Sequence, residues 1–190
     1  MGKRIMIGLG GNAIKQPHEL GTAEEQMRNV SVAGRQIAEI VRRGYEVVLT
    51  HGNGPQVGYL SIQQEQARRL VPPQPLSVLV AMTQGQIGFM IQQALGHQLA
   101  GEGRPVVTLV TQVIVDRDDP EFENPHKPVG PFYTREEAER LEAEKGWRFR
   151  RVHPSGDRPW RRVVPSPRPR GVVEGEAIKR LVEAGMIVIA

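Results

Sequence analysis

Two short loops of this chain are rich in glycine and asparagine, residues that are suited to binding an anion. One follows the apolar run "KRIMIGL" and the other follows "YEVVLT". Glycine lets backbone N–H groups approach an anion without a Cβ in the way, and asparagine adds an uncharged donor. We name them the first glycine loop, Gly10, Gly11 and Asn12, and the second glycine loop, Gly52, Asn53 and Gly54.

One such loop alone is more often a tight turn, but two of them in successive strand–helix units favour a ligand site. Their N–H groups would suit a phosphoryl group or a developing oxyanion. The sequence therefore predicts that the two loops jointly hold a phosphate.

The two commonest phosphate-binding signatures do not account for this pair. Residues 8–13 formally match G-x-G-x-x-A, but Pro17 and Gly21 prevent a helix from opening at that turn, and no acid for a ribose ends the second strand. A P-loop is excluded because no G-x-x-x-x-G-K-[ST] occurs. The site must belong to a different class of phosphate-binding protein.

Two other groups near the expected site have alternative interpretations. His51 ends the second strand and is a candidate general base or donor, although a lone histidine there is more often structural. The acidic run "DRDDPE" at 116–121 is a candidate site for a divalent cation, but it is more typical of a solvated turn. We predict no metal ligands in this chain.

The elements that position the loops alternate between strands and helices, which predicts an α/β fold with a largely parallel sheet. Ligands of such sheets gather beyond the carboxyl ends of the strands, where both glycine loops lie. Strands are expected at 3–9, 45–50, 104–116 and 186–190, and helices at 22–44, within 57–70, and at 76–100 and 172–185.

Three details of these elements can be tested. Thr22 and Glu25 form a capping box at the start of the first helix. Gly85 and Gly88 either permit close packing of the helix at 76–100 or kink it. The last strand, at 186–190, needs neighbours on both sides, and a bare apolar edge there would make the chain fold poorly alone.

The chain divides by composition into a core and an insertion. Residues 1–116 read as the N-terminal α/β core, and 170–190 return to its sheet. Between them, 117–169 is rich in proline, charge and aromatics and reads as a protruding lid. Its one expected helix, at 134–146, opens with a Thr134–Glu137 capping box.

Composition narrows the class of protein. The 190 residues include no cysteine, which excludes disulfides and thiolate metal sites and favours the reducing cytoplasm. No apolar run is long enough to span a bilayer, so no membrane partner is expected. The net charge of +4 is concentrated at 140–170, where a solvated basic surface is favoured over attraction of small anions, and nucleic acid is not expected as a partner.

Several longer motifs carry a resemblance to a known family. They are "GLGGNAI", "EEQMRNV", "RGYEVVLTHGNGPQVG", "MTQGQIGFMIQQAL", "NPHKPVGPFY" and "WRRVVPSP". In this order they resemble the carbamate kinases of the amino acid kinase family, over nearly the whole chain. Related kinases acting on acetylglutamate, aspartate or UMP are a weaker alternative, since they do not share the "NPHKPVGPFY" pattern.

The resemblance implies a three-layer α/β/α sandwich that forms a homodimer and transfers a phosphoryl group between carbamoyl phosphate and ADP with Mg²⁺. The products would be ATP and carbamate, which breaks down to ammonia and carbon dioxide, as in arginine breakdown. The first glycine loop would surround the moving phosphoryl group, with Gly11 and Asn12 catalytic, and the second would bind carbamoyl phosphate. Lys127 would reach from the insertion as a catalytic cation.

Family members are considerably longer, so the resemblance covers an N-terminal portion and leaves the fold incomplete at its C-terminus. The part implied to bind ADP or ATP and the metal follows in the family beyond residue 190. Three hypotheses remain open: a carbamate kinase lacking its remainder, a split enzyme completed by a complementing C-terminal chain, or a non-catalytic module that binds anions or a partner.

Overall fold

The computed structural model describes residues 3–153 and 155–190, which form two compact units. The first unit comprises 3–55, 80–112 and 173–190, and the second comprises 56–79 and 113–172. The sequence pattern placed the insertion at 117–169, and the second unit also takes in 56–79.

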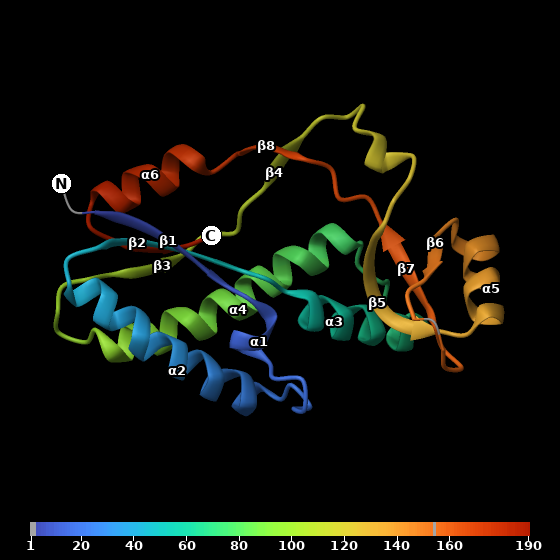
Figure 1. Ribbon diagram of the computed structural model, residues 1–190, viewed down its shortest axis with the longest axis horizontal. Coiled ribbons are helices and arrows are strands. Elements are labelled where there is room, and N and C mark those ends of the chain that lie inside the picture. The colour runs from blue at the N-terminus through green and yellow to red at the C-terminus, as the bar shows by residue number, and fades with distance from the viewer. Residues whose placement is uncertain (1–2, 154) are drawn as a thin grey trace. The chain divides into compact units, whose positions relative to one another are not determined.

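The first unit is built on a four-stranded parallel sheet in the order β1-β2-β9-β3, of which Figure 1 labels β1, β2 and β3. Its strands are β1 (Arg4–Leu9), β2 (Glu46–His51), β9 (Ile187–Ile189) and β3 (Val106–Thr108). All three neighbouring pairs run parallel, so the strands end at one edge of the sheet. The expected parallel sheet is confirmed.

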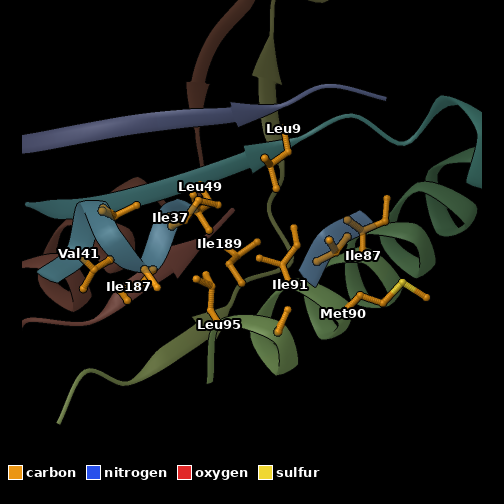
Figure 2. Close-up of a cluster of buried hydrophobic side chains, with 14 of the residues drawn as sticks. Leu9, Ile37, Val41, Leu49, Ile87, Met90, Ile91, Leu95, Ile187 and Ile189 are labelled. Carbon is orange, nitrogen blue, oxygen red and sulfur yellow. The ribbon is translucent and has the colours of Figure 1, made fainter. Parts of the chain in front are cut away.

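Helices cover both faces of this sheet, which confirms the α/β/α layering. On one face, α2 (Ala23–Arg42) and α4 (Leu76–Gln98) share a buried cluster with the strands, and Figure 2 shows its side chains interleaved. The labelled members are Leu9, Ile37, Val41, Leu49, Ile87, Met90, Ile91, Leu95, Ile187 and Ile189. On the other face, α6 (Gly175–Glu183) packs against β9 and β2.

The helix starts follow the local sequence signals. The Thr22 side chain accepts from the Glu25 N–H, and the Glu25 carboxylate accepts from the Thr22 N–H, so the capping box is present. No helix was expected directly after β1, yet one turn, α1 (Gly11–Ile14), forms there. It ends at Lys15, whose backbone is extended, before Pro17 and Gly21.

Two expectations about the sheet edges are wrong. β9 is a central strand with neighbours on both sides and is fully buried, so it leaves no bare edge. The apolar run at 3–9 predicts a buried strand, but this strand lies at the sheet edge as β1. Its side chains alternate between exposed and half-buried, and only Leu9 is fully buried. Met6, on its open face, is 73% exposed.

The single strand expected at 104–116 is instead two strands of different sheets. β3 ends at Thr108, and β4 (Val113–Val115) pairs antiparallel with β8 (Pro169–Val172) in the second unit. Between them, the side-chain oxygen of Gln84 accepts from the Thr111 N–H at 2.7 Å. A side chain thus replaces the ladder partner that a continuous strand would need.

The second unit contains an antiparallel sheet that the sequence pattern did not predict. β5 (Lys127–Tyr133), β7 (Trp160–Val164) and β6 (Arg148–Arg151) lie in that order, and α5 (Arg135–Lys145) packs on them. α5 opens with the expected Thr134–Glu137 capping box. A 3₁₀ turn, η1 (Pro120–Phe122), and most of α3 (Gly54–Ala67) complete the unit.

Over the described residues, no helix is both long enough and apolar enough to cross a bilayer. The longest helix, α4, is unbroken despite its glycines. The kink considered for Gly85 and Gly88 does not interrupt it.

Gly88 packs closely against β3, whereas Gly85 does not. A Cβ atom on Gly88 would lie 2.1 Å from Thr108 Cγ2, while one on Gly85 would meet nothing within 4 Å. Close packing therefore explains the glycine at position 88. Gly85 has open space beside it.

We predict opposite effects of adding a methyl group at these two glycines. Gly88→Ala should lower the free energy of unfolding by roughly 1–2 kcal/mol, because an overpacking cost of about 1–3 kcal/mol exceeds a gain in helix propensity of up to about 1 kcal/mol. Gly85→Ala should raise it by up to about 1 kcal/mol. Urea unfolding measures both.

Adding Thr108→Ser to Gly88→Ala removes the clashing methyl and should restore most of the lost stability. Equal stability of the Gly85→Ala and Gly88→Ala chains would contradict the close packing.

Candidate functional site

The two glycine loops lie side by side at the carboxyl edge of the first unit's sheet. Leu9, the last residue of β1, pairs with His51, the last residue of β2. One residue further, the Gly52 N–H donates to the Leu9 carbonyl oxygen at 3.1 Å. The structure thus joins the loops through a backbone hydrogen bond, although they are about forty residues apart in the sequence.

The first glycine loop leads into the single turn of α1. Gly10 is extended, with φ −69° and ψ 167°, and its carbonyl accepts from the Ala13 N–H at 3.0 Å. The Lys15 N–H donates to the Gly11 carbonyl at 2.8 Å. The N–H groups of Gly11 and Asn12, at the start of the turn, take no part in these bonds.

Neither packing nor backbone conformation requires glycine in these loops. None of the four loop glycines has a left-handed φ, and a Cβ on any of them would meet no protein atom within 4 Å. The four are Gly10, Gly11, Gly52 and Gly54. Bare backbone facing open space is the arrangement that a bound anion would need.

Asn53, in the second glycine loop, is held by α4. Its Nδ2 donates to Thr83 Oγ1 at 2.8 Å, and that hydroxyl donates to the Val80 carbonyl at 2.7 Å. Thr83 is fully buried and Asn53 is half-buried. α3 begins at the next residue, Gly54.

The next residue of α4 holds the segment that follows β3 at the same edge. Gln84 Oε1 accepts from the Thr111 N–H, and Gln84 Nε2 donates to the Thr111 carbonyl at 3.2 Å. Sequence reasoning missed Thr83 and Gln84. The available signal was an adjacent pair of polar residues inside an otherwise apolar helical run, followed by Gly85.

His51 is half-buried at the end of β2, and burial lowers the pKa of its ring below the ordinary 6.5. Its Nδ1 lies 3.4 Å from the Gly52 carbonyl. Because a carbonyl only accepts, Nδ1 carries the proton in this contact and Nε2 is left as an acceptor. Both its structural and its catalytic interpretations remain open.

Lys127 belongs to the second unit, where it is the exposed first residue of β5, opposite Val164 of β7. The other six candidate residues, those of the two glycine loops, lie together in the first unit. The catalytic role of Lys127 stays a prediction.

The acidic residues at 116–121 form hydrogen bonds and an ion pair within the second unit. Asp119 accepts from the N–H groups of Glu121 and Arg168, which lowers the pKa of its carboxyl group. Asp116 pairs with Arg170 at 3.4 Å. Within the described chain, no three His, Asp or Glu side chains gather as a metal site.

Comparison with known proteins identifies the family. The amino acid kinase family matches residues 3–190. The chain belongs to this family.

Within the amino acid kinase family, several carbamate kinases are similar to this chain. That of Pyrococcus furiosus is 58% identical, with 100% of this chain and 61% of that protein covered. That of Haemophilus influenzae is 52% identical, with 98% and 58% covered. The structure of the Giardia lamblia carbamate kinase bound to AMP-PNP has a TM-score of 0.89 at 45% identity, with 99% of this chain and 60% of that chain covered.

The chain thus spans about 60% of the length of the carbamate kinases that it matches. The resemblance to an N-terminal portion of these enzymes is confirmed. The α/β/α fold is confirmed by the same structural neighbour.

The lowered pKa of His51 predicts a loss of stability in mild acid. The unfolded chain binds this proton more tightly than the folded chain, so the stability is fully present above pH 6.5 and is lost as the pH falls through the lower folded pKa. We expect the urea concentration at the unfolding midpoint to be lower at about pH 5.5 than at pH 7. The difference between the two pH values should be smaller in His51→Gln.

His126→Gln is the matched control, since His126 is exposed and pairs with Glu121 in the second unit. If His51→Gln showed the same pH dependence as the wild-type chain, burial of His51 would not be its cause.

Proposed function

We propose that this chain supplies the carbamoyl phosphate side of a carbamate kinase-type phosphoryl transfer. The reaction passes a phosphoryl group between carbamoyl phosphate and ADP, and gives ATP and carbamate, which breaks down to ammonia and carbon dioxide. The observation that carries the proposal is the pair of glycine loops joined by the Gly52–Leu9 bond, with open space beside all four glycines.

The mechanism needs positioning and hydrogen-bond donors more than a reactive side chain. During transfer, negative charge spreads over the oxygens of the moving phosphoryl group. N–H groups of the first glycine loop, with the Asn12 side chain, would stabilise that charge. The second glycine loop, with Asn53, would hold carbamoyl phosphate so that its phosphorus faces the acceptor.

Lys127 is proposed as a catalytic cation toward the same phosphoryl oxygens. A lysine ammonium group is a compact point charge with three donors, which suits phosphate. Its place at the exposed start of β5 leaves the side chain accessible. This role rests on the family resemblance of the "NPHKPVGPFY" motif.

The described residues do not fit a Mg²⁺ ion by themselves. Mg²⁺ prefers oxygen ligands and is usually held by carboxylates and substrate phosphates. The loops and their hydrogen-bond partners offer amides, backbone groups and the Thr83 hydroxyl, but no carboxylate. We therefore assign Mg²⁺ to the nucleotide phosphates.

The nucleotide is proposed to bind mainly to residues that this chain does not contain. The matched carbamate kinases extend well beyond the aligned part, and the one from Giardia lamblia binds AMP-PNP. A continuing polypeptide or a complementing C-terminal chain would then complete the site. Arginine breakdown in the cytoplasm is the proposed setting.

A homodimer is proposed from the family resemblance, and one face of the first unit is suited to it. Phe89 and Met82 of α4 are 60% and 45% exposed, and Val110, after β3, is 50% exposed. Phe89, Val110 and Thr108 are among the residues that line a cavity of about 530 Å³. Large exposed apolar side chains on one unit are typical of a protein interface.

A second candidate function is anion binding without turnover. Both glycine loops lie within the first unit, and their mutual hydrogen bond needs no residue outside it. The chain would then bind phosphate-like anions but transfer nothing by itself.

The test measures ATP formation from carbamoyl phosphate and ADP with Mg²⁺, against a no-enzyme control for spontaneous breakdown. The three arms are this chain alone, the chain mixed with the unmatched remainder of the Pyrococcus furiosus enzyme, and a fusion of the two. We expect turnover with the fusion, and with the mixture if the halves associate. In the fusion, Asn53→Ala should lower kcat/KM for carbamoyl phosphate by roughly tenfold or more.

Sustained turnover by the chain alone would contradict the assignment of the nucleotide site to other residues. A folded but inactive fusion would contradict the proposed reaction and leave anion binding as the function.

A further inference from the structure

We infer that Thr83 is a positioning residue, which fixes the side-chain amide of Asn53 for an anion held by the second glycine loop. The inference rests on the proposed function, because it concerns how that loop holds its ligand. Thr83 belongs to α4 and is not part of either glycine loop. Three observations carry it.

The first observation is that the Thr83 hydroxyl is already satisfied within its own helix. Thr83 is fully buried on α4. A buried hydroxyl is costly without a hydrogen bond, and Oγ1 donates to the Val80 carbonyl at 2.7 Å. Asn53 is therefore not needed to offset the burial of this group.

The second observation is the direction of the Asn53–Thr83 bond. The Thr83 hydroxyl donates its one hydrogen to the Val80 carbonyl, so Oγ1 acts toward Asn53 as an acceptor. It accepts from Asn53 Nδ2 at 2.8 Å. A flipped amide would place Oδ1 against an oxygen without a hydrogen to share. The two bonds, from Asn53 to Thr83 and from Thr83 to Val80, therefore favour this orientation of the Asn53 amide.

The third observation is that the loop is held on both sides of Asn53. On one side, the Gly52 N–H donates to the Leu9 carbonyl, and on the other, α3 begins at Gly54. With the backbone held in this way, the side chain is the part of Asn53 that remains to be oriented, and Thr83 orients it.

The consequence for the ligand is preorganisation. The bond to Thr83 uses one of the two Nδ2 hydrogens, and the other keeps a fixed direction. A donor fixed before binding loses less freedom when the anion arrives, and acts more strongly on it. Without Thr83, the same donor would have to be ordered by the ligand.

Two substitutions of Thr83 separate orientation from packing. Thr83→Val keeps the shape but removes the hydroxyl, and Thr83→Ser keeps the hydroxyl but removes the methyl group. Asn53→Ala and the double variant Asn53→Ala/Thr83→Val complete a cycle that isolates the pair. Urea unfolding of each variant verifies that it folds.

The experiment uses the full 190-residue chain labelled with ¹⁵N, with freshly prepared carbamoyl phosphate and then inorganic phosphate as probes. Thr83→Val should weaken carbamoyl phosphate binding by roughly tenfold, Thr83→Ser by less than about twofold, and Thr83→Val should have no further effect once Asn53 is alanine. In the ligand-free chain, the Asn53 side-chain amide signals should move in Thr83→Val and stay nearly in place in Thr83→Ser.

Equal weakening by Thr83→Val and Thr83→Ser would overturn the inference, because packing would then be the cause. An undiminished effect of Thr83→Val in the Asn53→Ala chain would also overturn it. If the wild-type chain bound neither probe, the proposed function would fail, and the ligand-free amide signals would still decide the role of Thr83. Unchanged signals in Thr83→Val would overturn that role.

Discussion

The pairing of β1 with β2 is the constraint on which the candidate site depends. Parallel strands in this register place Leu9 beside His51, and the next backbone group, the Gly52 N–H, extends the ladder by one bond. A shift of one residue would turn the buried face of β1 outward and separate the two glycine loops. The register is fixed by burial, since Leu9 and Leu49 both enter the cluster shared with α2 and α4. Core packing directly beneath the two glycine loops therefore sets the geometry of the site.

Much of the first unit could be predicted from local signals. Glycine and asparagine after two apolar runs predicted the two loops, and their location at one edge followed from the rule for parallel sheets. The capping boxes at Thr22 and Thr134 are present because each depends only on residues three apart in the sequence. The resemblance to carbamate kinases rested on long motifs and is confirmed by a carbamate kinase that is 58% identical to this chain.

The features that the sequence did not predict depend on distant contacts. Residues 104–116 are apolar enough for one strand, but Gln84 binds Thr111 and the chain leaves the sheet there. The identity of the edge strand depends on strand order, and the alternating exposure of β1 was visible only in the structure. Thr83 was missed because a threonine in an apolar helix gives no sign of the loop that it contacts. The strands of the second unit were not predicted, because their segments are rich in proline and charged residues, which are untypical of strands.

The central claim is that the two glycine loops act together on one phosphoryl group. The most direct measurement is titration of the ¹⁵N-labelled chain with carbamoyl phosphate, followed at the backbone amides of Gly10, Gly11, Gly52 and Gly54, with Gly11→Ala as a variant that blocks the first loop. The account predicts that all four signals move on one saturation curve and that Gly11→Ala abolishes the response in both loops while the chain stays folded. Movement of only one loop, or a response confined to the basic segment at 140–170, would contradict it.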